Sequence, residues 1–408
     1  STYDTPHIVL KLGGLRLTKS DQPVAAFLWA VLYWFGILNM VIAVILELIY
    51  MAEVGKKGTF EAAVEIFGMI PCCGYLIMAA IKSYKIFVYR PVFENLINEL
   101  RSMWPQRDVT KEEYQLIEKP IKRLNFINKV YFWCNHLLLA FFIVPHVVDV
   151  GKRWLGHQVQ LKLPFFFWLP FDAQAKYVYE FMLLLQSCIM YLYSRSLVCV
   201  WLILCSDTLF CAFMVHITTQ FDLLAIRIRQ MIHVPIDKQL IAQFPLAIDS
   251  KGFAKSRERM DLYEDVVWES RHLKELNDVV IRHRALIRLS GDVESMFSFQ
   301  LLVNFIYSSI IICFCGFVCI VIEKWNEFIY KTFLTSALTQ TWLFCWYGQR
   351  LLDSSRGIGD ALYNSGWYLV SKRVRNNILI MLHSQVFCLQ IIKTSWSYFT
   401  LLLNTYKK

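Results

Sequence analysis

Histidine and cysteine are the residue types of this chain that could support acid–base or metal chemistry, and their spacing argues against both. His136 and His146 lie in one apolar stretch, ten residues apart with no acidic residue between them. Catalytic and metal sites need clustered histidines or carboxylates. The twelve cysteines lie almost wholly in apolar segments, and the adjacent pair Cys72–Cys73 lacks the spacing of metal ligands. The sequence therefore predicts no catalytic residue, no metal site and no cofactor, and we do not expect an enzyme.

His136, His146 and nearly all of the cysteines lie in long apolar segments, which would position their side chains. The chain has 408 residues, of which 56% are hydrophobic and only 18% are charged. A hydrocarbon core about 30 Å thick needs about 20 helical residues to cross it. Seven apolar runs reach that length: Phe27–Met51, Ala62–Tyr84, Leu124–Val148, Tyr177–Cys205, Met296–Ile322, Phe328–Tyr347 and Ile378–Leu403. We predict an all-α membrane protein with seven transmembrane helices.

Lysine and arginine are distributed unevenly between alternate loops of these segments. Counted from a cytosolic N-terminus, thirty of the 42 lie in inside loops or at the adjoining ends of segments, ten lie likewise on the outside, and Arg195 and Lys393 lie farther within segments. Because positive residues accumulate on the cytosolic side of membrane proteins, we predict that the N-terminus is inside and the C-terminus outside. The net charge of +10 then marks a cytosolic surface that faces membrane lipid, and nucleic acid is not an expected partner.

Two long stretches predict helices that extend into the cytosol. Phe171–Val234 contains neither glycine nor proline, so we predict one helix that leaves the membrane near Cys205. Phe253–Ser290 has apolar residues at helical spacing. Its interleaved acidic residues favour packing between helices over a calmodulin-like or a solvated helix. We predict four parts: residues 1–205 with the N-terminal tail and spans one to four, 206–295 as a cytosolic helical anchor, 296–352 with spans five and six, and 353–408 with a split seventh helix.

Specific motifs appear toward the C-terminus. They are ALYNSGWY at Ala361–Tyr368, the pair Ser384–Gln385, and KTSWSYFTLLLNTY at Lys393–Tyr406. Together with LPFFFWLPFD at Leu163–Asp172 and the predicted inverted topology, they resemble the insect odorant receptor family over essentially the whole chain.

The resemblance implies an odour-gated, non-selective cation channel in the plasma membrane of sensory neurons. It implies a heterotetramer in which this chain, as a tuning subunit, joins a shared odorant co-receptor. It also implies that the last helix lines the pore, with Leu401 at a hydrophobic gate, Asn404 in a polar ring and Thr405 at a second gating position that is usually apolar. The alternative is that these residues pack or face lipid in an ordinary span.

For such a receptor we expect a ligand pocket among the outer halves of the helices, because a volatile ligand arrives from outside. Its binding energy must come mainly from apolar contact. The candidate lining residues are Met69, Cys73, His136, Leu139, Phe142, His146, Tyr179, Met182, Leu183, Gln186 and Phe305. Of these, His136, His146 and Gln186 are candidate hydrogen-bond partners for an aldehyde, alcohol or ester, or alternatively interhelical contacts.

Two other receptor classes remain as alternatives. A seven-span metabotropic receptor would need a cytosolic C-terminal tail and an acidic-Arg-aromatic triplet after span three, neither of which we find. A gustatory-type receptor channel has a related terminal motif, but Ser397 and Asn404 stand where that motif has Thr and Gln.

Overall fold

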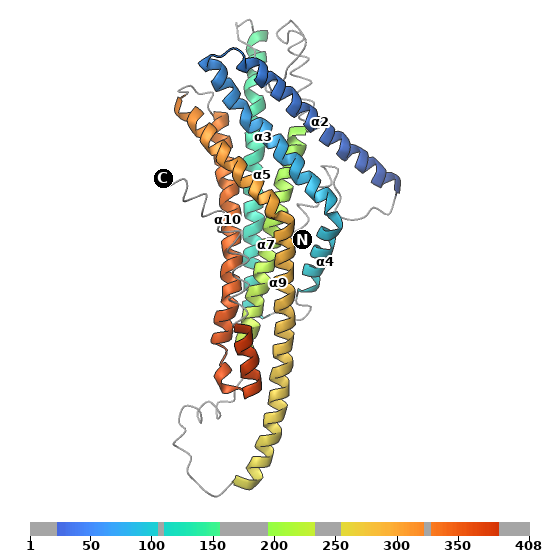
Figure 1. Ribbon diagram of the computed structural model, residues 1–408, viewed down its shortest axis with the longest axis vertical. Helices are drawn as coiled ribbons and strands as arrows, with labels where there is room; N and C mark the ends of the chain where they lie inside the picture. The colour runs from blue at the N-terminus through green and yellow to red at the C-terminus, as the bar shows by residue number, and fades with distance from the viewer. Residues whose placement is uncertain (1–22, 105–109, 156–194, 233–253, 322–327, 383–408) are drawn as a thin grey trace. The chain divides into compact units, whose positions relative to one another are not determined.

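The computed structural model describes residues 23–104, 110–155, 195–232, 254–321 and 328–382 (Figure 1). Within these ranges every regular element is a helix and no strand occurs, so the predicted all-α fold is confirmed. The elements are α2 (Pro23–Gly55), α3 (Phe60–Val88), α4 (Arg90–Ser102), α5 (Lys111–Trp154), α7 (Arg195–Met231), α9 (Ala254–Val321), α10 (Phe328–Tyr363), the short 3₁₀ helix η2 (Trp367–Leu369) and a helical segment at residues 372–382.

Most of the predicted apolar segments coincide with described helices. The first, second, third, fifth and sixth segments fall in α2, α3, α5, α9 and α10. The fourth and seventh, with the loop Leu163–Asp172, lie wholly or mostly outside the described residues. The charged stretch before Ser290 and the fifth apolar segment form one helix, α9, whose 68 residues continue through Gly291.

Four stretches of the described helices are long and apolar enough to cross a membrane, and they differ in what covers them. They are Tyr33–Gly55, Met69–Val88, Ile203–Met231 and Glu269–Gly316. In the most apolar part of the α2 stretch only 11% of residues are buried inside the protein, whereas in the α7 stretch 83% are. The apolar residues of α2 therefore have the exposure expected of a lipid-facing helix, while those of α7 are covered by other helices. The sequence alone placed the end of the fourth span at Cys205, and burial explains why apolar residues continue beyond it.

The chain divides into two compact units. The first unit comprises Ser1–Glu99, Ile121–Phe213 and Met296–Trp346, and the second comprises Leu100–Pro120, Met214–Ser295 and Tyr347–Lys408. Helices α5, α7, α9 and α10 each contribute residues to both units.

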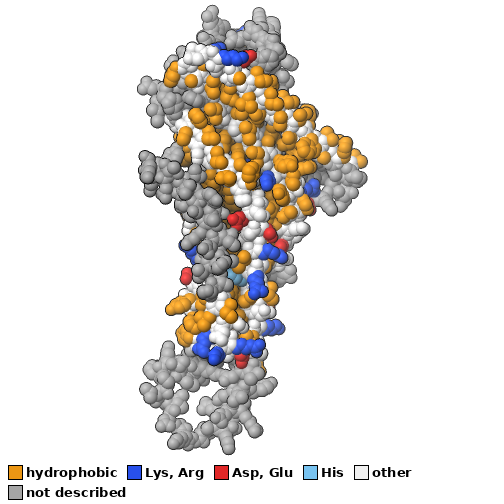
Figure 2. Space-filling view, in the orientation of Figure 1, with side chains coloured by type: hydrophobic (Ala, Val, Ile, Leu, Met, Phe, Trp, Pro, Cys, Tyr) orange, Lys and Arg blue, Asp and Glu red, His pale blue; other side chains and the backbone are white. Residues whose placement is uncertain are grey.

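In the first unit, α2 and α3 form a packed pair joined by a tight turn. Gly58 has a φ of 61°, a left-handed conformation that favours glycine, and the side chain of Thr59 accepts the backbone N–H of Ala62 at 3.2 Å to cap α3. The opposite face of α2 is covered with exposed apolar side chains, and hydrophobic residues dominate the visible face of these helices in Figure 2. They include Val24, Phe27, Leu28, Val31, Trp34, Phe35, Leu38, Ile45 and Leu48. A continuous apolar surface of this kind is typical of contact with lipid.

Phenylalanines fill the interior of the first unit where α4, α7, α9 and α10 meet. The ring of Phe297 lies 5.1 Å from Phe210 and 5.7 Å from Phe93 between centroids, in edge-to-face arrangements. Phe210 also makes an edge contact with Phe344 at 5.4 Å. Each such pair adds about 0.5–1.5 kcal/mol beyond the burial of its area, so these rings fix the four helices against one another.

In the second unit, the ALYNSGWY motif forms the turn after α10. Leu362 is fully buried, and the hydroxyl of Ser365 donates to its carbonyl oxygen at 2.7 Å. Gly366 then reverses the chain with a φ of 72°. Farther on, the hydroxyl of Ser371 donates to the carboxylate of Glu269 on α9 at 3.0 Å. The motif therefore has a structural role, because it turns the chain back so that the 372–382 segment can pack.

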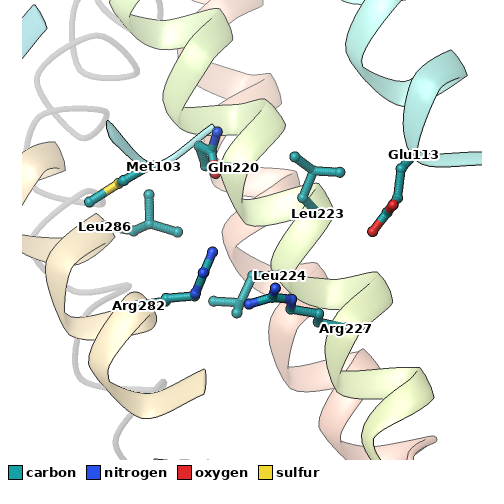
Figure 3. A pocket seen from close by; sticks show the side chains of 8 residues that line it. All are labelled: Met103, Glu113, Gln220, Leu223, Leu224, Arg227, Arg282 and Leu286. Carbon is teal, nitrogen blue, oxygen red and sulfur yellow. The ribbon is translucent and has the colours of Figure 1, made fainter. Parts of the chain in front are cut away.

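Edge-to-face rings also pack the described part of α7 in the second unit. Trp104 contacts His216 at 5.4 Å and Phe221 contacts His283 of α9 at 6.3 Å between centroids. A pocket opens in this unit between α7 and α9, with Met103 and Glu113 on its other walls (Figure 3). It takes no part in the site described next, which belongs to the first unit.

Candidate functional site

The close approach of α3 and α9 is the starting point of the candidate site. Proline at position 71 interrupts the hydrogen bonding of α3 because it has no N–H to donate. The Tyr307 hydroxyl of α9 donates to the Pro71 carbonyl oxygen. One turn on, Gly74 lies under the Tyr307 ring so closely that a Cβ there would overlap it. Pro71 and Gly74 therefore let a tyrosine from α9 lie directly on the backbone of α3.

Around this contact lies a cluster of apolar and aromatic side chains from α3, α9 and α10, which we call the aromatic cluster. Its buried centre is formed by Ile311, Cys315, Phe333 and Ala337, and Cys72, Tyr75, Tyr307, Tyr330 and Leu334 pack against that centre. The rings of Tyr75 and Phe333 meet edge to face at 6.3 Å. In composition the cluster resembles the lining of small-molecule sites, where apolar and aromatic side chains supply contact area and a few polar groups set orientation.

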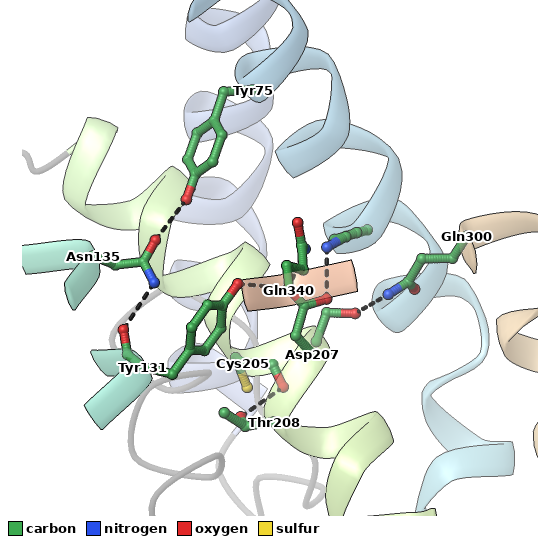
Figure 4. Close-up of polar contacts among 10 residues, drawn as sticks. Tyr75, Tyr131, Asn135, Cys205, Asp207, Thr208, Gln300 and Gln340 are labelled. Atoms are coloured by element: carbon green, nitrogen blue, oxygen red, sulfur yellow. Dashed lines mark hydrogen bonds and ion pairs between the residues drawn. The ribbon is translucent and has the colours of Figure 1, made fainter. Parts of the chain in front are cut away.

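A buried ion pair lies at the centre of a polar network in the same unit, which we call the Asp207 network (Figure 4). The carboxylate of Asp207 on α7 accepts the ammonium of Lys82 on α3 at 2.6 Å. It also accepts the side-chain amide of Gln340 on α10 at 2.6 Å and the hydroxyl of Tyr131 on α5 at 3.2 Å. Lys82 is 0% and Asp207 2% exposed. One carboxylate therefore connects four helices without access to solvent.

Tyr75 belongs to both structures and joins them. Its hydroxyl donates to the side-chain oxygen of Asn135 at 3.1 Å, and the Asn135 amide donates to the backbone oxygen of Tyr131 at 2.8 Å. Beside Asp207, Ser206 accepts the side-chain amide of Gln300 on α9 at 2.7 Å (Figure 4). A displacement of the Tyr75 ring in the aromatic cluster would therefore act on the bonds that hold α5 and α7.

The Asp207 network favours one arrangement of the helices over others. Charges removed from water are costly unless every partner is present, and removing one member of a buried pair costs about 3–5 kcal/mol. Polar and ionisable groups at membrane depth are correspondingly rare and are often functional. This network supplies geometric precision to the helices around the aromatic cluster.

The structure places three of the sequence-predicted ligand residues. Met69 and Cys73 are buried on α3, and Phe305 is half-buried on α9. Their neighbours Cys72, Tyr75 and Tyr307 are the residues that join the aromatic cluster. Met69, Cys73 and Phe305 therefore lie on two helices that contribute to the aromatic cluster, and their role as ligand contacts stays a prediction.

The remaining predicted site residues are not placed. His136, Leu139, Phe142 and His146 belong to α5, but the description of that helix does not extend to their side chains. Seven others lie outside the described residues: Tyr179, Met182, Leu183, Gln186, Leu401, Asn404 and Thr405. Their roles stay predictions.

Sequence reasoning missed the ion pair. Lys82 is one of the thirty lysines and arginines assigned to the inside, and Asp207 lies two residues beyond the expected membrane exit at Cys205, yet both side chains are buried. A lone cation near the end of one apolar segment and a lone acid near the end of another is the signal that could have suggested a pair. The two residues are 125 positions apart, so sequence proximity gave no guidance.

A family model and the sequences of known relatives point to the same protein family. A family model described as 7tm Odorant receptor matches residues 63–408. Odorant receptor 85b of Drosophila melanogaster is 25% identical over 367 residues, which cover 89% of this chain and 83% of the relative. Putative odorant receptor 85d of the same species is 27% identical over 359 residues, covering 86% and 77%.

Solved structures show the same fold. The insect olfactory receptor OR5 from Machilis hrabei superposes with a TM-score of 0.71 at 15% identity, covering 98% of this chain and 97% of that one. The same receptor in complex with eugenol gives a TM-score of 0.70.

Proposed function

Because the chain belongs to the 7tm odorant receptor family, we propose that it is an odorant-gated, non-selective cation channel subunit whose ligand binds at the aromatic cluster. Members of the family are receptors, so the expectation that the chain is not an enzyme is confirmed. The expectation of a multi-pass membrane protein is confirmed as well.

The observation that carries the proposal is the position of Tyr75, which contacts the aromatic cluster and donates to Asn135. A ligand can shift a conformational equilibrium only if it binds one state better than the other. A molecule that contacts Phe333 or Tyr75 in one state, and reorients the Tyr75 hydroxyl, would have that differential affinity. The change would reach α5 through Asn135 and Tyr131, and then the Asp207 network.

The composition of the cluster favours a small, largely apolar ligand. Burying 200 Å² of apolar ligand surface supplies about 5 kcal/mol, which corresponds to a dissociation constant of about 0.2 mM. One or two hydrogen bonds to Tyr75 or Tyr307 would tighten this and fix orientation. The complex of the OR5 receptor with eugenol supports small-molecule binding by this fold. His136, His146 and Gln186 remain proposed polar contacts of the ligand.

For the channel itself we infer an arrangement from the sequence. The unequal distribution of lysine and arginine supports a cytosolic N-terminus and an extracellular C-terminus. In that orientation, Leu401, Asn404 and Thr405 would form the gate of a pore lined by the last helix. The subunit would assemble with the shared co-receptor as a heterotetramer in the plasma membrane of sensory neurons, with residues 206–295 as the cytosolic anchor.

The proposal is tested by recording whole-cell currents from cells that express this chain with the co-receptor, against a panel of volatile compounds. We expect concentration-dependent inward cation currents that cells with the co-receptor alone do not give for the same compounds. A chain that reaches the surface with the co-receptor but gives no current to any compound beyond that control would contradict it.

A further inference from the structure

The pocket of the second unit has a chemistry unlike that of the aromatic cluster. It is lined by Met103, Glu113 of α5, Gln220, Leu223, Leu224 and Arg227 of α7, and Arg282 and Leu286 of α9. The pocket is partly open to solvent. Two of the lining side chains are guanidinium groups, and Figure 3 shows them reaching toward the same opening from α7 and α9. Basic residues from two helices at one opening favour an anionic occupant.

The acidic residue of the pocket has a structural task of its own. Glu113 accepts the backbone N–H of Thr110 at 3.0 Å, while its own backbone N–H donates to the Thr110 hydroxyl at 3.3 Å. This reciprocal capping box begins α5. With one carboxylate so engaged and two guanidinium groups present, the lining keeps a formal charge of +1.

Gln220 supplies an independent observation. Its side chain is only 6% exposed and lines the pocket, yet its amide nitrogen has no hydrogen-bond partner within the described part of the chain. A buried donor left unsatisfied costs about 1–3 kcal/mol. Its neighbour Thr219, in contrast, donates to the carbonyl oxygen of Val215 at 2.8 Å. An acceptor brought by a ligand would satisfy the Gln220 amide.

We propose that this pocket binds a small phosphate-bearing molecule, with Arg282, Arg227 and Gln220 donating to phosphate oxygens. Guanidinium forks match the geometry of phosphate in a way that a point charge does not. The apolar side chains Met103, Leu223, Leu224 and Leu286 provide a wall for the organic part of the molecule. The same chemistry fits a soluble nucleotide or the headgroup of a phosphoinositide lipid. Either would bridge α7 and α9 inside the second unit and stabilise that unit.

Thermal unfolding of the purified full-length chain in detergent, without odorant, tests this site separately from channel activity. The probes are sodium pyrophosphate, ATP and water-soluble dioctanoyl phosphatidylinositol 4,5-bisphosphate, with sodium sulfate at equal ionic strength as the salt control. We expect at least one phosphate probe to raise the midpoint in a saturable way. For the Arg282→Gln variant, the apparent dissociation constant of that probe should rise about tenfold or more. The Arg282→Lys variant should give an intermediate dissociation constant, because lysine keeps the positive charge but lacks the two-pronged guanidinium geometry.

Arg284→Gln is the matched control, since Arg284 is exposed on the same helix and does not line the pocket. The apparent dissociation constant of the phosphate probe for this variant should stay within about twofold of the value for the unaltered chain. Stabilisation by pyrophosphate or ATP identifies a soluble ligand, and stabilisation by the phosphoinositide alone identifies a lipid headgroup. The proposal is overturned if no probe stabilises the chain at low-millimolar concentration, or if Arg282→Gln and Arg284→Gln weaken binding equally.

Discussion

Asp207→Asn is the substitution that probes the buried ion pair most directly. Asparagine keeps the shape of aspartate and one acceptor oxygen, so part of the bonding to Tyr131 and Gln340 can persist. It removes the negative charge and leaves the ammonium of Lys82 at 0% exposure without its counter-charge, 2.6 Å from a neutral group. Loss of one member of a buried pair costs about 3–5 kcal/mol, whereas a neutral hydrogen bond is worth about 1 kcal/mol. The charge therefore dominates the expected effect.

The assay is thermal unfolding of purified protein in detergent, together with surface labelling in cells. At about 2 °C per kcal/mol for a large chain, we expect the midpoint to fall by about 6–10 °C. The double variant Lys82→Met/Asp207→Leu removes both charges at similar volume and should recover most of that loss, because a buried pair replaced by apolar residues is often neutral.

Asp149→Asn is the control for the substitution itself. Asp149 pairs with Lys152 at 3.6 Å with both side chains partly exposed, so its loss should cost less than about 1 kcal/mol. The reasoning is refuted if Asp207→Asn unfolds within about 1 °C of the unaltered chain, or if the double variant is as unstable as the single one.

Three further predictions concern the aromatic cluster, the pore and the polar lining. Gly74→Ala should lower stability by about 1–3 kcal/mol because its Cβ would overlap Tyr307, while Gly36→Ala, with open space around it, should not destabilise; equal unfolding midpoints would refute the close approach. Leu401→Ala should raise the ligand-free current in cells with the co-receptor, and an unchanged basal conductance at normal surface expression counts against the gate. His136→Ala should shift the odorant dose–response with the maximal current intact, and a fall in surface expression alone would make that histidine structural.

The sequence predicts the helices well but not their faces, and α3 shows the reason. A segment such as Ala62–Tyr84 is recognisable by length and apolarity alone. In a membrane, however, apolar side chains face both lipid and protein, so periodicity does not distinguish Met69 and Cys73 from Cys72 and Tyr75. The local signals that do mark the contact face are Pro71 and Gly74, a helix breaker and a residue without a side chain.

The Asp207 network could not be predicted, because it depends on which helices are neighbours. Its members come from α3, α5, α7 and α10, and nothing in the local sequence of Tyr131 or Gln340 indicates a shared partner. The burial of the apolar residues of α7 after Cys205 could not be predicted for a similar reason. Contact with neighbouring helices and contact with lipid both favour apolar residues, so the sequence does not distinguish the two. The ALYNSGWY motif, in contrast, was visible in the sequence, and the turn at Ser365 and Gly366 gives its physical reason.

Two leucines one turn apart on α10 allow the most direct test of the account. Leu334 packs against the aromatic cluster, whereas Leu338 is 50% exposed. Odorant-evoked current is measured against concentration for Leu334→Ala and Leu338→Ala, each with the co-receptor and at matched surface expression. Loss of about 1–2 kcal/mol of apolar contact predicts a half-maximal concentration shifted about five- to thirtyfold for Leu334→Ala and within twofold for Leu338→Ala. Equal dose–responses for the two variants would contradict a ligand site at the aromatic cluster.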